Sequence, residues 1–156
     1  MSTLYVDNLQ PNLGTGVHAA GHVVQVVQGT AEEVNINAGD YALINLSFTP
    51  KFVGSKFLVL CTIPNITGTA GNFFQLQSYI GTSATPTSNT RVIYARTSMI
   101  GTGASNTQTL TASDYGSFTC SSTATHYVSA SVTTEGSMAI ARHSATCKLQ
   151  LMEIAQ

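Results

Sequence analysis

Short apolar segments separated by turn residues run through the chain from His22 onward, and this pattern limits the folds open to it. Almost no stretch repeats apolar residues every three or four positions, as an amphipathic helix would. Clusters of Gly, Ser, Thr, Asn and Pro, such as residues 37–40 and 53–55, bound the segments and favour turns. The pattern predicts an all-β fold of antiparallel strands.

The segments between these turns have the length and composition of strands. They are His22–Gln28, Glu33–Ile36, Tyr41–Phe48, Lys56–Pro64, Phe73–Ile80, Arg91–Thr97, Thr107–Leu110, Gly116–Cys120, His126–Thr133 and Ala145–Ile154. Long polar loops are expected at Asn65–Asn72, Gly81–Asn89 and Gly101–Asn106. A chain of this size with about eight to ten strands fits an antiparallel two-sheet sandwich that is jelly-roll-like.

The segment Lys56–Pro64 is apolar on both faces over most of its length. Successive side chains of a strand point to opposite faces, so Leu58 and Leu60 lie opposite the side chains that enter the core. We therefore predict that the segment is a central strand, or that one of its sides meets another subunit. The candidate interface residues are Leu58, Leu60, Val24 and Val26.

Residues 1–21 differ from the rest of the chain. Leu4, Val6 and Leu9 alternate loosely, but Pro11 and several glycines follow, which is too broken a pattern for a strand of the main sandwich. We interpret residues 1–21 as an extended arm for attachment or trimer contacts, and residues 22–156 as the β-sandwich domain. The alternative is a disordered terminus.

Charged residues make up only 8% of the chain, against about 25% in an ordinary soluble domain. Charged side chains resist desolvation, so a surface with few of them offers little resistance to association. We expect partners to cover much of the surface. A net charge of −1 without a Lys/Arg cluster favours neither nucleic acid nor membrane binding. The alternative is a β domain of a Ser/Thr-rich secreted protein.

The cysteines and the N-terminal sequence indicate a reducing compartment. No run of 18 apolar residues exists, and the N-terminal residues lack the basic and apolar regions of a signal peptide, so we expect synthesis in a cytoplasm without a targeting segment. Cys61, Cys120 and Cys147 are widely spaced, and we expect buried, reduced thiols. A Cys120–Cys147 disulfide is the alternative.

Residues that carry chemistry are scarce. The chain has no GxSxG or HExxH motif and no phosphate-binding glycine loop, and the adjacent Glu32 and Glu33 would point to opposite faces of a strand. His18 and His22 have a helical metal-ligand spacing, but the glycines around them favour coil. His126 and His143 have no ligand partners nearby in the sequence. We therefore predict no catalytic residue, cofactor or metal site.

One local concentration of residues is suited to recognition. Tyr and Arg side chains are frequent in binding surfaces, and the chain gathers Tyr79, Arg91, Tyr94 and Arg96 in two neighbouring segments. Alternation within Arg91–Thr97 predicts Arg91 on one face, with Ile93, and Tyr94 with Arg96 on the other. A receptor surface could also use polar loop residues. The candidates in the loops are Asn65, Asn72 and Asn89. The alternative for the segment is a subunit contact.

Segments at both ends and in the middle of the chain resemble small tail-fibre-like proteins of marine phages, including those of cyanobacteria. They are STLYVDNLQPNLGTG, GHVVQVVQGT, FTPKFVGSKFLVL and KLQLMEIAQ. The resemblance implies a virion protein with a trimeric β-sandwich, in which KLQLMEI is the last strand. These motifs consist of strand and turn residues, so they indicate a structural module rather than a receptor.

The resemblance and the composition together lead to one expectation and two alternatives. We expect a homotrimeric virion protein, a short tail fibre or appendage, whose arm docks on other virion proteins and whose polar loops meet a host glycan or protein. Only about twenty residues precede the GHVVQVVQ segment, so attachment would use this arm or the sandwich. The alternatives are a capsid decoration or cement protein without a host receptor, and a carbohydrate-binding module.

Overall fold

The computed structural model describes residues 21–69, 72–98, 107–141 and 144–156, and within these ranges the chain forms ten strands and one short 3-10 helix. The strands are β1 (Val23–Ala31), β2 (Val34–Ile36), β3 (Gly39–Phe48), β4 (Lys56–Thr69), β5 (Phe73–Gly81), β6 (Thr90–Ser98), β7 (Thr107–Thr119), β8 (His126–Thr134), β9 (Met138–Ile140) and β10 (Cys147–Ile154), and the helix is η1 (Pro86–Ser88). Residues 1–20, including the arm residues Leu4, Val6 and Leu9 and the histidine His18, lie outside the described residues, as do Arg142 and His143.

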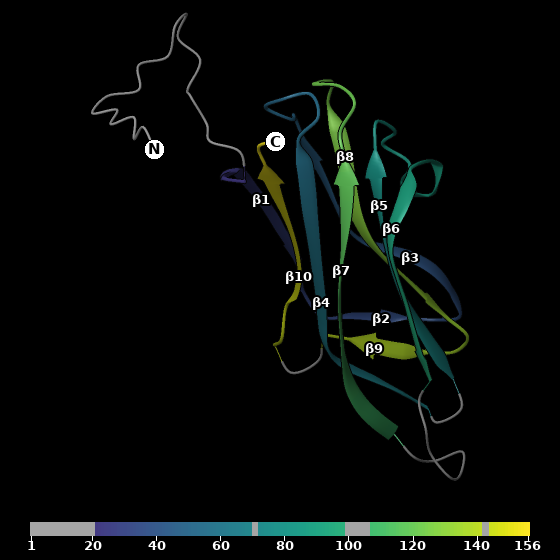
Figure 1. Cartoon of the computed structure of the whole chain (residues 1–156). Helices are drawn as coiled ribbons and strands as arrows, with labels where there is room; N and C mark the ends of the chain where they lie inside the picture. The colour runs from purple at the N-terminus through teal and green to yellow at the C-terminus, as the bar shows by residue number, and fades with distance from the viewer. Residues whose placement is uncertain (1–20, 70–71, 99–106, 142–143) are drawn as a thin grey trace, which may run out of the picture.

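The strands form two antiparallel sheets packed face to face (Figure 1). Sheet 1 has the order β1-β10-β4-β7 and is extended beyond the end of β10 by β9 and β2, and sheet 2 has the order β3-β8-β5-β6. Apart from the short β2 and β9, only β5 and β6 are consecutive strands within one sheet, and the first strand pairs with the last. This is the strand order of a jelly roll, so the prediction of an antiparallel two-sheet sandwich is confirmed.

The core lies between the sheets, and apolar side chains enter it from alternate positions of the strands. In β4 the side chains of Phe57, Val59 and Cys61 are fully buried, and in β10 the burial pattern alternates from Cys147 to Ile154. Burial of these apolar side chains contributes roughly 25 cal/mol per Å² of surface removed from water. Each strand therefore commits one face to the core, and only its other face is available for function.

Strand β4 extends into one predicted loop, and β7 joins two segments that were predicted as separate strands. β4 continues to Thr69, where a loop at Asn65–Asn72 was expected, because a bulge between Ile63 and Ile66 absorbs the irregular residues and the pairing with β7 resumes beyond it. Asn65 sits in that bulge with a φ of 50°. Likewise β7 is one strand, where Thr107–Leu110 and Gly116–Cys120 were expected to be separate, since its ladder with β4 runs throughout. The three-residue strand β9 was not predicted.

Candidate functional surfaces

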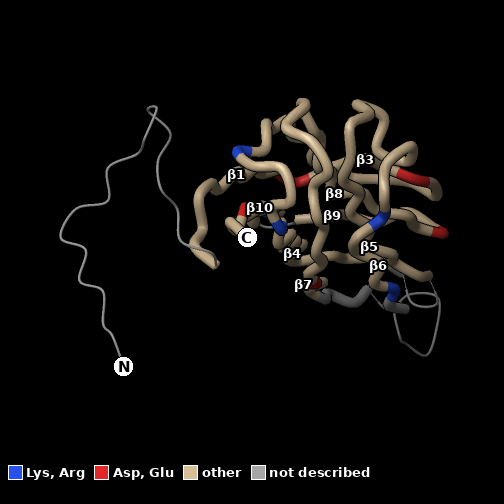
Figure 2. The backbone as a smooth tube through the Cα atoms, turned by 45° about the horizontal axis from the view of Figure 1, so that its top comes forward, with Lys and Arg blue, Asp and Glu red and all other residues tan. Residues whose placement is uncertain are grey.

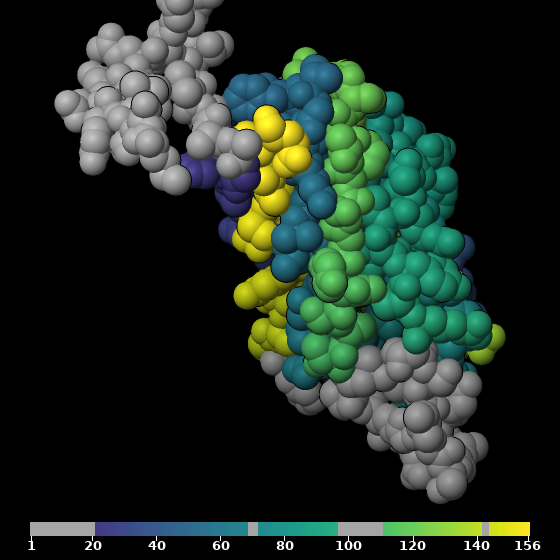
Figure 3. Space-filling view, viewed as in Figure 1, coloured from purple at the N-terminus to yellow at the C-terminus, as the bar shows by residue number. Residues whose placement is uncertain are grey.

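The outer surface of sheet 1, where β10, β4 and β7 lie side by side in Figure 3, has an apolar centre, which we call the apolar face. Its side chains follow the pairing of the strands: Val26 of β1 lies beside Met152 of β10, and Met152 lies beside Leu58 of β4. In the adjacent row Leu60 lies beside Tyr115 of β7. Val26 is 50% exposed and Tyr115 is 72% exposed, both high values for large side chains of these types.

Lysines stand at both ends of the apolar face. Lys56 pairs with Ile154 in the row beyond Leu58, and Lys148 pairs with Thr62 in the row beyond Leu60. The predicted interface residues Leu58, Leu60 and Val26 are thus brought onto one surface. Val24 is half-buried and lies at a register shift between Val23 and Gln25. An apolar centre with a polar margin is the usual composition of a protein–protein interface.

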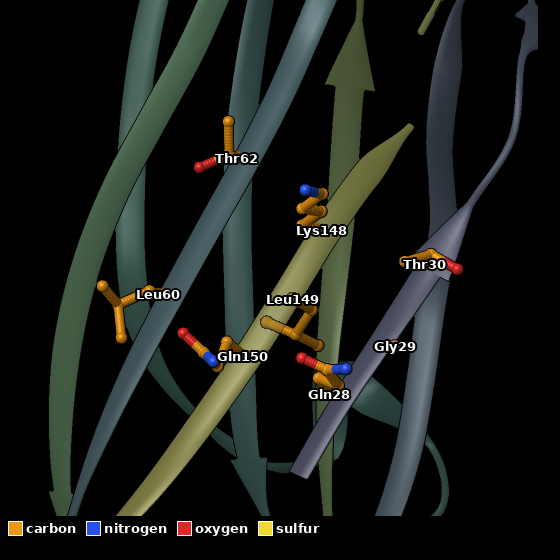
Figure 4. Close-up of a pocket in the computed structure, with 8 residues that line it drawn as sticks. All are labelled: Gln28, Gly29, Thr30, Leu60, Thr62, Lys148, Leu149 and Gln150. Atoms are coloured by element: carbon orange, nitrogen blue, oxygen red, sulfur yellow. The ribbon is translucent and has the colours of Figure 1, made fainter. Parts of the chain in front are cut away.

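A hollow of about 400 Å³ opens beside the apolar centre (Figure 4). Residues of β1, β10 and β4 line it: Gln28, Gly29, Thr30, Leu60, Thr62, Lys148, Leu149 and Gln150. The lining offers amide and hydroxyl groups and one ammonium group, but it holds no carboxylate or thiol. Its chemistry therefore suits contact with another surface better than catalysis.

The outer surface of sheet 2, which we call the polar face, places Arg91 differently from the prediction. Ser78 pairs with Ile93 and Tyr79 pairs with Arg91, so Val92 is an extra residue in β6. This bulge interrupts the alternation and turns Arg91 to the same face as Tyr94, where its guanidinium stacks 4.3 Å from the centroid of the Tyr94 ring. The prediction that Arg91 shares a face with Ile93 is wrong for this reason. Tyr79, Arg91, Tyr94 and Arg96 now all belong to the polar face.

A hydrogen-bond network crosses all four strands of the polar face. The Nε2 atom of Gln77 donates to Oγ1 of Thr133 at 2.9 Å, and Thr133 in turn donates to Oδ1 of Asp40. The Oε1 atom of Gln77 accepts from the Tyr79 hydroxyl and, at 3.4 Å, from Nη1 of Arg91. Both ends of this nearly buried amide are thereby occupied, which holds the surrounding side chains in place.

A second hollow, of about 220 Å³, lies over this network. Its lining comes from β3, β5, β8 and the loop after β5: Asp40, Tyr41, Ala42, Gln77, Tyr79, Pro86, Thr87, Ser131, Val132 and Thr133. The loop is held over the sheet by a bond from Nδ2 of Asn45 to the carbonyl of Ala84, at 3.1 Å. Asn89 closes the same loop, since its side chain binds both the backbone N–H and the carbonyl of Ser83.

The predicted loop asparagines do not form one surface. Asn89 is turned toward its own loop, and Asn72 is half-buried with its amide packed where a side chain at Gly136 would lie. Asn65 is half-buried in the bulge of β4. Sequence reasoning found Tyr79 and Arg91 but missed Gln77, Thr133 and Asp40. The alternation of Gln77 with Tyr79 could have placed those two on one face, whereas the pairing with β8 is not visible locally.

The three thiols are buried and unpaired. Burial, with the nearby Cys147 thiol as a smaller cause, raises the pKa of Cys61 to about 12, and burial raises the pKa of Cys147 to about 11. The strand pairing also separates Cys120 from Cys147. Cys120 follows Thr119, which pairs with Lys56 of β4, whereas Cys147 precedes Lys148, which pairs with Thr62 of β4. These points are about 20 Å apart along β4, well beyond disulfide reach in this fold.

Some of the other titratable groups are exposed and others are buried. Within the described part of the chain no three His, Cys, Asp or Glu side chains come together as a metal ion would require. His22, Glu32 and Glu33 are exposed, whereas His126 is buried between Phe48 and Phe118.

Glu153 was not singled out from the sequence; it is fully buried. Its carboxylate accepts the backbone N–H groups of Lys51 (2.8 Å) and Phe52 (3.1 Å). No described helix is long and apolar enough to cross a membrane.

Comparisons with known proteins give weak structural similarities only. No protein-family model matches the chain. No curated protein matches it either. Among solved structures, the VP2 subviral particle of infectious bursal disease virus has 11% identity and a TM-score of 0.43, over 98% of this chain and 42% of that one. Dimeric latent PorU from Porphyromonas gingivalis has 10% identity and a TM-score of 0.41, over 90% of this chain and 14% of that one. This chain thus spans less than half of either protein.

Proposed function

We propose that the chain is a non-catalytic structural protein of a virus particle, which assembles as a homotrimer and serves as a short tail fibre or appendage. The observation that carries this proposal is the apolar face of sheet 1, with Val26, Met152, Leu58 and Leu60 at its centre and lysines at its ends. The resemblance of four segments to tail-fibre-like proteins of marine phages supports the virion assignment.

Association through the apolar face has a clear physical basis. These side chains lie on the side of sheet 1 away from the core, so folding of one copy leaves Val26 and Tyr115 largely exposed. Stable interfaces remove about 800 Å² per partner from water. Figure 2 shows how few charged residues the described part of the chain carries, so few charges need to be desolvated when copies associate. In a cyclic trimer, the apolar face of each copy would be buried in the contacts around the threefold axis.

Sheet 2 remains outside such an interface. Its polar face, with Tyr79, Arg91 and Tyr94, would then point away from the trimer contacts and toward a host surface. A capsid decoration protein without a host receptor would use the same apolar face. Imaging of labelled protein on the intact particle separates the two roles: a tail position supports the appendage, and a position on the capsid surface supports the decoration protein.

The mass in solution tests the assembly. Sedimentation equilibrium of the full chain at micromolar concentration should give three times the mass of one chain. Leu58→Lys places a charge at the centre of the apolar face and should weaken association at least about 30-fold, or about 2 kcal/mol, while the far-ultraviolet circular dichroism spectrum stays unchanged.

Val53→Lys is the matched control, because Val53 is 65% exposed in the turn before β4 and lies outside the apolar face. It should leave the mass unchanged. A monomeric wild-type chain at this concentration, or equal effects of the two lysine substitutions, would overturn the proposed assembly.

A further inference from the structure

We propose that the hollow over Gln77 on the polar face binds a single neutral sugar ring. The inference deepens the proposed function, since it names the class of ligand for host recognition. The site itself belongs to sheet 2, whereas assembly is assigned to sheet 1. The two ideas can therefore fail separately.

The polar groups of the hollow are fixed before a ligand arrives. Gln77 is 8% exposed, and its amide is held by Thr133 at one end and by Tyr79 and Arg91 at the other. Thr133 is held in turn by Asp40, so one chain of bonds sets the orientation of all of these side chains. Groups fixed in this way lose little conformational entropy on binding, which favours even a small ligand.

The same groups keep unused bonding capacity. A carboxylate accepts about four hydrogen bonds, and Thr133 supplies only one of them to Asp40. The Tyr79 hydroxyl donates to Gln77 and can still accept. A sugar hydroxyl donates and accepts at once, so it can use an acceptor such as Asp40 and a donor such as the hydroxyl of Thr87, which also lines the hollow, together.

The shape and charge of the hollow narrow the ligand class further. Its volume of about 220 Å³ is below the roughly 300–1,000 Å³ of sites for drug-sized ligands, so it suits one ring rather than a chain of several. Tyr79 and Pro86 add apolar lining for the C–H groups of a ring. Asp40 adds a negative charge to the lining, which disfavours phosphates, uronic acids and other anions.

Saturation-transfer NMR with the full chain tests the proposal. The probes are the methyl glycosides of glucose, galactose and mannose, together with N-acetylglucosamine, at millimolar concentration, and glucuronic acid as the anionic comparison. At least one neutral probe should receive saturation, and glucuronic acid should receive less. Asp40→Asn and Tyr79→Phe should each lower the affinity for that probe about tenfold, because each removes a charged or hydroxyl partner of the sugar.

Two controls match these variants in chemistry. Asp114→Asn changes a carboxylate on β7 of the other sheet, and Tyr127→Phe removes a hydroxyl from the same polar face outside the hollow. Both should bind as the wild type does. Absence of transfer to every neutral probe, preference for glucuronic acid, or equal losses in variants and controls would overturn the proposal. The mass of the same sample reports on assembly independently, whichever result is obtained.

Discussion

The outer faces of the two sheets differ much more than their inner faces. In β4 the outward positions hold Leu58 and Leu60, whereas in β5 they hold Gln75 and Gln77. The inward positions of both strands are apolar with the exception of Ser78, whose hydroxyl donates to the carbonyl of Ser129 at 2.6 Å. The core requires similar inner faces, and it places no such requirement on the outer ones.

This contrast indicates where function is encoded in a jelly roll of low charge. An outward leucine contributes less to the stability of one copy than an inward one, because it stays partly in water. An outward glutamine whose amide is hydrogen-bonded at both ends must also be held in one conformation, which costs more entropy than leaving the side chain hydrated and mobile. Each face therefore carries features that folding alone does not demand, and substitutions at and between the faces can test the contrast.

The largest effect is expected where an edge of sheet 1 meets an edge of sheet 2. A Cβ atom at Gly116 of β7 would lie 2.1 Å from the carbonyl oxygen of Val92, the bulged residue of β6. Gly116→Ala should lower the free energy of unfolding by about 4 kcal/mol, because backbone atoms must move apart. Urea unfolding at one protein concentration measures it. Ser117→Ala, at the neighbouring outward position, should change stability by less than about 0.5 kcal/mol. If Gly116→Ala and Ser117→Ala changed the free energy of unfolding equally, the backbones of β7 and β6 would be able to move apart at little cost.

The next effect concerns the connection that carries the chain from sheet 2 to sheet 1. Buried Glu153 accepts backbone N–H groups of Lys51 and Phe52 in that connection. Glu153→Leu should lower the free energy of unfolding by about 3 kcal/mol, since the N–H groups lose a charged acceptor. Glu153→Gln keeps one acceptor oxygen and should cost about half as much. Met152→Leu, on the outer face of the same strand, is the control and should cost less than about 1.5 kcal/mol. A Glu153→Leu variant as stable as this control would show that the carboxylate does not hold the connection.

Local patterns in the sequence predicted the fold class and part of each face. Alternation in Lys56–Pro64 placed Leu58 and Leu60 outward, as the structure confirms. The same rule failed at Arg91, because a one-residue bulge at Val92 reverses it and depends on pairing with β5. The bond between Thr133 and Asp40 joins residues 93 positions apart, so only the strand order could reveal it. Strand order depends on long-range pairing, which no local pattern contains.

Alkaline pH should weaken sheet 1 through its two core thiols, which sheet 2 lacks. The pKa values of Cys61 and Cys147 are raised to about 12 and about 11, so the folded protein favours the neutral thiols. Above pH 9 the unfolded chain releases these protons first, and stability falls as the pH rises toward 11. The expected loss is on the order of 1 kcal/mol per pH unit for each thiol. Urea unfolding at pH 8 and pH 10 with reductant measures it. A Cys61→Ala/Cys147→Ala double variant should show a shallower decline, and an equal decline would contradict the assignment.

The smallest effect compares one substitution on both faces. Thr133→Val on the polar face keeps the shape but removes the hydroxyl that accepts from Gln77 and donates to Asp40, so it should lower the free energy of unfolding by about 1 kcal/mol. Thr62→Val on sheet 1 removes an exposed bond of 3.2 Å to Ser113, for which water can substitute, and should cost less than about 0.5 kcal/mol. Thermal unfolding of both variants in the Leu58→Lys background avoids differences in assembly. Equal losses of stability in the two variants would mean that the hydrogen bonds of the polar face are no more ordered than those of a hydrated sheet surface. The hollow would then not be preorganised for a ligand.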